Sequence, residues 1–226
     1  MLITTNSLEP DRLINIVSFD KKHLGLLPAD YIAFLQNFGA GTYCDEVVID
    51  YPDTDHIFLT FGDRSDLREF DEFYSATDLI KSIQIGWSVN GDIICVTAQR
   101  KGKVFILPRQ ASSIKSFTSF FDAIKFLLPD ADPEYFDPTY DSAYEQINLI
   151  TESGLIDILP IRQAFLEKFK FDFVVNEATQ PKYIIKAFGG WIMFDLIYKN
   201  SITLKFQNQY KANMLPLLHF LAADKK

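Results

Sequence analysis

Apolar and polar residues form three runs typical of β-strands between Ile83 and Leu107. The first two runs meet at Asn90-Gly91, a dipeptide that tolerates the positive φ angles of a tight hairpin turn. A second turn, Gln99 to Gly102, precedes the third run. We therefore predict a three-stranded antiparallel meander as the sheet core of the first domain.

Several stretches of this half have the spacing of helices. The clearest begins at Pro28, has one apolar face and can end at Gly39 in the left-handed conformation. Its apolar face comprises Tyr31, Phe34, Leu35 and Phe38. The other predicted helices are Ser7 to Val17, a short one capped by Ser75-Ala76-Thr77-Asp78 and ending near Lys81, and one capped by Ser116 and ending at Leu128.

Two short runs between these helices have β-type composition. Cys44 to Tyr51 and Ile57 to Phe61 are separated by Pro52-Asp53-Thr54-Asp55, which has the composition of a turn. We predict a strand on each side of that turn.

A proline-rich stretch marks the domain boundary. Proline removes a backbone donor and disfavours helix in the preceding residue, and residues 129–138 contain Pro129, Pro133 and Pro138. We predict one domain over residues 1–130, a linker over 131–140 and a second α+β domain over 141–226. The fold class that follows is α+β, with an antiparallel meander sheet flanked by helices.

The second domain is predicted from its turn and cap signals. Its expected elements are a helix from Asp141 to Gly154, a helix capped by Asp157, a second meander (Tyr183 to Phe188, Trp191 to Tyr198, Ile202 to Phe206) and a last helix from about Tyr210 to Ala222, with Pro216 inside it. The order of strands, turns and helix thus occurs twice. Either a duplication or the general frequency of helix-capped meanders accounts for it.

Composition excludes some classes of partner. The formal net charge is −8, which disfavours non-specific binding to nucleic acid or anionic membranes and favours a basic protein partner. The first residues lack a signal-peptide pattern and no apolar run is long enough to span a membrane, so we expect a soluble, cytoplasmic protein. Cys44 and Cys95 lie in apolar, strand-like surroundings and are predicted to be two buried free thiols, with a disulfide as the alternative.

A run of acidic residues between Asp45 and Asp78 is the main candidate for a binding surface. It contains eleven acids against two arginines, with aromatic residues between them. Carboxylates on one face would steer a basic partner, and rings would anchor it. The alternative is a solvated loop region that only keeps the protein soluble. The predicted partner-binding residues are Asp45, Glu46, Asp50, Tyr51, Asp53, Asp55, Asp63, Asp66, Glu69, Asp71, Glu72, Phe73 and Tyr74.

Other candidate chemistry is weak. Asp53-Thr54-Asp55-His56 has metal-ligating types, but the other histidines are distant in sequence. Gly39-Ala40-Gly41 follows a helix, whereas a phosphate-binding loop precedes one. Trp87 is predicted to pack in the sheet core, with contact to a partner as the alternative. We expect no catalytic residues, no metal and no cofactor.

The order of several short segments along residues 1–130 adds a resemblance. The segments are Leu27-Pro28-Ala29-Asp30-Tyr31, Asn37-Phe38-Gly39-Ala40-Gly41, Ile85-Gly86-Trp87, Asn90-Gly91-Asp92-Ile93, Gly102-Lys103-Val104-Phe105, and Ser116-Phe117 with Phe120-Phe121. In this order and spacing they resemble the SMI1/KNR4 family of the SUKH superfamily.

That resemblance implies an α+β domain without catalysis. Bacterial members typically are immunity proteins that bind and neutralise a polymorphic or contact-dependent toxin, often a nuclease. The expected partner is then a basic toxin domain. The alternative is an intracellular adaptor that docks an endogenous protein on its acidic surface, and a toxin gene directly upstream would favour the first hypothesis.

Overall fold

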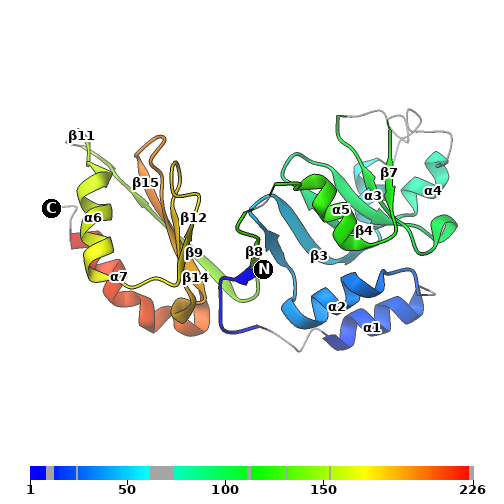
Figure 1. The fold of residues 1–226 in the computed structure, drawn as a ribbon, viewed down its shortest axis with the longest axis horizontal. Helices are drawn as coiled ribbons and strands as arrows, with labels where there is room; N and C mark the ends of the chain where they lie inside the picture. Colours follow the sequence, from blue (N-terminus) through cyan, green and yellow to red (C-terminus); the bar gives the residue numbers. More distant parts are fainter. Residues whose placement is uncertain are drawn as a thin grey trace. The chain divides into compact units, whose positions relative to one another are not determined.

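The computed structural model describes residues 1–8, 13–23, 25–61, 74–110, 113–130, 132–152 and 154–223. The chain folds into two compact units, residues 8–138 and residues 1–7 with 139–226 (Figure 1). We call them the N-terminal and C-terminal units. The chain thus divides between Pro138 and Thr139, inside the predicted linker, and a second time between Ser7 and Leu8, where the sequence had given no signal.

The N-terminal unit is a mixed α+β structure. Its sheet has the antiparallel strand order β8-β2-β3-β4-β5-β6-β7. The strands are β2 (Gly41–Tyr43), β3 (Val47–Asp53), β4 (Ile83–Ser88), β5 (Ile93–Val96), β6 (Val104–Leu107), β7 (Lys115–Phe117) and β8 (Tyr135–Pro138). The helices are α1 (Leu13–Lys22), α2 (Ala29–Phe38), α3 (His56–Thr60), α4 (Ala76–Ile80) and α5 (Phe120–Leu127), with the 3-10 turn η2 (Ala98–Arg100).

Strands β4, β5 and β6 form the predicted meander, with Gly91 at positive φ in the first turn. Every residue of β5 and β6 is buried, so both faces of the sheet need a cover. Helices α2 and α5 supply one cover and α3 and α4 the other (Figure 1).

One carboxylate of α2 holds α5 in place. Asp30 Oδ2 accepts the backbone N–H groups of Phe120 (2.8 Å) and Phe121 (3.2 Å), which open α5. Ser119 Oγ accepts a third, from Asp122 (3.1 Å). Helix N-termini present N–H groups without partners inside the helix, and here a residue about ninety positions away satisfies two of them.

The C-terminal unit is also α+β. Its sheet has the antiparallel order β12-β13-β14-β15-β9, and α6 and α7 cover one face of it (Figure 1). The strands of this sheet are β9 (Ser142–Asn148), β12 (Phe173–Val175), β13 (Lys182–Ile185), β14 (Gly190–Phe194) and β15 (Ser201–Gln207). The strands β10 (Ile150–Thr151) and β11 (Gly154–Leu155) pair only with each other, and β1 (Leu2–Ile3) lies in the first residues of the chain. The helices are α6 (Ile158–Lys168) and α7 (Lys211–Ala223), with the 3-10 turns η3 (Lys186–Phe188) and η4 (Asn208–Tyr210).

The first residues of the chain belong to this unit through hydrogen bonds to β15. Thr5 Oγ1 donates to Gln207 Oε1 (2.9 Å), and Gln207 Nε2 donates to the carbonyl of Ser7 (3.0 Å). The second predicted meander is confirmed as β13, β14 and β15. Gly190 allows it, since a Cβ there would lie 2.0 Å from the Lys205 carbonyl oxygen.

The α+β fold class and the helix caps at Ser75 and Asp157 are confirmed. The helix predicted to begin at Pro28 begins one residue later, at Ala29. The helix predicted from Asp141 to Gly154 is wrong, because residues 142–148 pair with β15 along its whole length. The α5 cap is Ser119, and Ser116 lies in β7. The helix predicted over 7–17 begins at Leu13; residues 9–12 of that prediction lie outside the described residues.

The cap by Asp30 gives a testable prediction. Asp30→Ala leaves the first N–H groups of α5 without their acceptor and should lower the free energy of unfolding of the N-terminal unit by about 1–2 kcal/mol. Denaturant unfolding followed by circular dichroism measures it. Gln36→Ala, at an exposed position of the same helix, should change the free energy by less than about 0.5 kcal/mol. Equal effects of the two substitutions would contradict the proposal that the Asp30 carboxylate stabilises the start of α5.

Candidate functional site

The first acids of the predicted surface lie in the turn between β2 and β3. Cys44 and Asp45 adopt positive φ angles (50° and 60°), and Glu46 is exposed after them. Asp45 is half-buried beside Tyr135. Burial, and then the Asp45 carboxylate, raises the pKa of the Tyr135 phenol, so this hydroxyl stays protonated. Glu46 is therefore the better placed of the two acids for contact with a partner.

Asp50 and Tyr51 lie in the middle of β3. The Asp50 side chain is exposed and Tyr51 is half-buried. The Asp50 carbonyl accepts a hydrogen bond from the hydroxyl of Tyr31 on α2. Burial raises the pKa of Tyr31 well above its usual value, and the Asp50 charge adds to the rise. The backbone at Asp50 is thus fixed by the core while its carboxylate faces solvent.

Asp53 and Asp55 lie where β3 passes into α3. Asp53 Oδ1 accepts the backbone N–H groups of Asp55 (2.8 Å) and His56 (3.0 Å). Thr54 Oγ1 donates to Asp55 Oδ1 (3.2 Å). Both carboxylates are exposed, and the bonds of Asp53 bend the chain into the helix.

The strand predicted over Ile57 to Phe61 is wrong, since these residues belong mainly to α3. Ile57 points into the core against Leu79, Ile80 and Ile93. Phe58 is 56% exposed and Leu59 is 77% exposed. A mainly apolar run of five residues fits a strand or one helical turn equally well. The hydrogen bonds that Asp53 accepts just before this run favour the helix.

Tyr74 does not belong to the exposed surface. It is 7% exposed, its ring centroid lies 5.0 Å from that of Phe105, and its hydroxyl lies 2.7 Å from Ser116 Oγ. Its predicted role as a partner anchor is therefore corrected to a core role. The remaining predicted site residues lie outside the described residues: Asp63, Asp66, Glu69, Asp71, Glu72 and Phe73.

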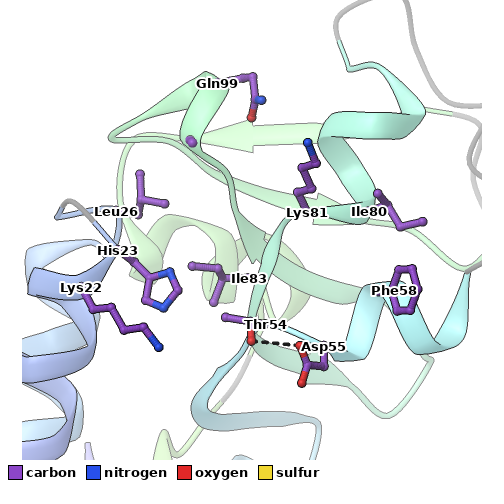
Figure 2. A pocket seen from close by; sticks show the side chains of 11 residues that line it. Lys22, His23, Leu26, Thr54, Asp55, Phe58, Ile80, Lys81, Ile83 and Gln99 are labelled. Atoms are coloured by element: carbon purple, nitrogen blue, oxygen red, sulfur yellow. Dashed lines mark hydrogen bonds between the residues drawn. The ribbon is translucent and has the colours of Figure 1, made fainter.

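A groove of about 610 Å³ runs beside α3 on the side of α1 (Figure 2). We call it the His23 groove. Its floor is apolar, and its rim carries charges of both signs. Figure 2 shows Asp55 and Thr54 at one edge, with Lys22 and His23 from the end of α1 across from Phe58. It is lined by Lys22, His23, Leu26, Thr54, Asp55, Phe58, Ile80, Lys81, Ile83, Ala98 and Gln99.

Trp87 lies on the other side of α3. It pairs with Val48 and Ile93 in neighbouring strands, so it shares the sheet face that α3 and α4 cover. It was predicted to be in the core, but the cover ends before reaching it and 39% of it is exposed. No local pattern signals this exposure, because the extent of the cover depends on where α3 packs.

Neither cysteine is a reactive candidate. Both are free thiols, as predicted, but Cys95 is buried and Cys44 only half-buried. Burial raises the pKa of each above its usual value. Across the described ranges, no three His, Cys, Asp or Glu side chains converge as a metal site requires. Among the helices that the structure describes, none has the length and apolar character needed to cross a bilayer.

Comparisons of this chain with protein-family models, with curated proteins and with solved structures found no match. No relative therefore bears on the geometry around α3.

Asp53 gives a prediction specific to this site. Asp53→Ala removes the acceptor of two N–H groups at the start of α3 and should destabilise the N-terminal unit by about 1 kcal/mol. Asp55→Asn removes the neighbouring charge and keeps an acceptor for Thr54, so its effect should stay within about 0.5 kcal/mol. Thermal and urea unfolding of both variants measure the difference. A larger loss in Asp55→Asn than in Asp53→Ala would contradict this assignment.

Proposed function

We propose that this is a non-catalytic binding protein that docks a basic protein partner on the surface around α3. The observation that carries the proposal is the pair of exposed apolar side chains, Phe58 and Leu59, beside the exposed carboxylates of Asp53 and Asp55. We call these four residues the α3 surface. Large apolar groups rimmed by charge are typical of protein interfaces, where the apolar groups anchor and the charges steer.

Charge along β3 extends the α3 surface. Glu46 and Asp50 are exposed like Asp53 and Asp55, and a strand rises about 3.3 Å per residue, so the four carboxylates follow a strip roughly 20 Å or more in length. A basic partner would meet this strip first, which raises its association rate.

The His23 groove limits where the partner sits. Lys22 and Lys81, which line the groove from the ends of α1 and α4, would repel a basic surface, whereas Asp55 and Phe58 would attract it. We therefore place the contact on the α3 side of the groove. The lysines then help to reject partners that are basic over their whole surface.

Toxin immunity is the form of this function that the resemblance to the SMI1/KNR4 family implies. A toxin that acts on nucleic acid grips phosphates with a basic groove. A carboxylate strip seated in that groove would exclude the substrate without any chemical step. The finer prediction of a SUKH-like domain over residues 1–130 is part of this proposal.

Charge removal on the strip tests the proposal. The variant Glu46→Gln/Asp50→Asn/Asp55→Asn should weaken binding to a purified, inactivated basic toxin domain encoded beside this gene by about 10- to 100-fold, because close charge pairs contribute a few kcal/mol at interfaces. Raising the salt concentration should also weaken binding of the toxin domain by the unaltered protein, because salt screens surface charges. Calorimetric titration and survival on co-expression of the active toxin are the measurements.

The matched control removes three charges from the other unit. Glu145→Gln/Glu152→Gln/Glu177→Gln are exposed positions there and should leave affinity and survival unchanged. If this control weakens binding as much as the strip variant, net charge and not the strip is responsible, and the site assignment fails. If no basic toxin binds and no cell is protected, the function itself is wrong.

A further inference from the structure

A second cavity lies between α3 and the β4–β5 hairpin, within the N-terminal unit. Its volume is about 530 Å³, in the range typical of small-molecule sites. We call it the Trp87 pocket. It is lined by His56, Thr60, Phe61, Trp87, Gly91, Ile93 and Arg109.

The walls of the Trp87 pocket are mainly apolar. Trp87 and Ile93 are paired across β4 and β5 and form its floor, and Phe61 closes it from the end of α3. Trp87 is 39% exposed here, whereas Ile93 is buried. An exposed indole over a buried aliphatic side chain is a surface on which a flat or branched apolar group packs well.

One cation is held at the rim of the Trp87 pocket. The backbone N–H of Arg109 donates to Asp92 Oδ1 (3.0 Å), which anchors this residue beside the hairpin. Its side chain crosses Gly91, where an added Cβ would lie 2.6 Å from Arg109 Cδ and 3.3 Å from Nη1. Any other residue at 91 would displace the guanidinium, so the glycine serves both the turn and the position of the charge.

Asp92, the acid that accepts the Arg109 backbone N–H, is already engaged on both carboxylate oxygens. Asp92 Oδ2 accepts a hydrogen bond from Ser88 Oγ (3.1 Å), and Asp92 Oδ1 accepts the Arg109 N–H. Within the part of the chain that the structure describes, no carboxylate forms an ion pair with the Arg109 guanidinium. A guanidinium at the edge of an apolar pocket fits a planar carboxylate with two parallel hydrogen bonds.

We propose that the Trp87 pocket binds a small hydrophobic carboxylate, a ligand with an aromatic or branched apolar body and one terminal carboxylate. The apolar body packs on Trp87, Phe61 and Ile93, and the carboxylate faces Arg109. The α3 wall adds a polar group to the pocket, the imidazole of His56, whose Nε2 lies 3.4 Å from Thr60 Oγ1. This site is separate from the α3 surface, and its ligand is not the protein partner proposed above.

Titration of the full-length protein with 4-phenylbutyrate tests the inference. Calorimetry and the fluorescence of the Trp191→Phe variant, in which Trp87 is the one remaining tryptophan of the sequence, should show saturable binding below millimolar concentration at low salt. The neutral analogue 4-phenylbutyramide should bind about tenfold or more weakly, because it lacks the charge that Arg109 recognises.

Two variants locate the binding. Arg109→Gln should lower the affinity for 4-phenylbutyrate to that of the amide and leave the affinity for the amide unchanged. An unaltered unfolding midpoint shows that the variant is folded. Lys81→Gln, which removes a cation from the His23 groove instead, should change neither ligand. The inference is overturned if 4-phenylbutyrate shows no binding at about 10 mM, well above the dissociation constant expected here. It is also overturned if the acid and the amide bind equally tightly, or if Lys81→Gln and not Arg109→Gln weakens binding of the acid. None of these outcomes bears on the basic protein partner.

Discussion

The N-terminal unit depends on covering both faces of β5 and β6. These strands are apolar at every position, so neither face can be left to water. On one face, α2 and α5 meet the requirement, with Asp30 fixing their relation through the first N–H groups of α5. On the other face the cover is α3 and α4, two helices of five residues each. Ile57, Leu79 and Ile80 share one buried cluster with Ile93, Cys95 and Phe105, to which Tyr74 and Ile114 also belong.

The candidate site is a consequence of this small second cover. A single turn of helix can bury one residue in three or four, so Ile57 goes inward while Phe58 and Leu59 stay outside. Because α3 is short, Trp87 lies beyond its reach and remains partly exposed. Grooves therefore open on both sides of α3, and the Asp53 bonds that start the helix place carboxylates at its edge. The exposed apolar and acidic groups come together from one local cause.

The sequence predicted the parts of the fold that local chemistry decides. Ser75 and Asp157 offer side-chain oxygens to helical N–H groups, and the structure has both caps. The hairpin at Asn90-Gly91 is also present, but Gly91 has positive φ and Asn90 does not, so the turn is not the tight type in which both residues do. Residues 142–148 were predicted as a helix because Asp141 looked like a cap. Asp141 instead has positive φ and bonds Asn208, and pairing with β15 decides the conformation of the strand. Long-range pairing of this kind leaves little trace in the local pattern.

The site was harder to predict than the fold. Carboxylates at 46, 50, 53 and 55 are exposed, but Tyr74 is a core residue and Trp87 is a surface residue, the reverse of their expected places. Aromatic side chains serve cores and interfaces equally well, so composition cannot separate the two uses. Arg109 and Lys81 were not predicted as site residues, because only the folded hairpin and helix place them beside α3.

Hydrogen exchange on the complex with the basic partner tests most directly whether the edge of the small cover is the binding face. Exchange should slow in residues 47–61 and 83–93, where backbone groups of β3, α3 and β4 lie under or beside the partner. Residues 142–207 should exchange as in the free protein. Slowing confined to 142–207 would contradict the account, because the partner would then bind a sheet on which none of the α3 residues lies.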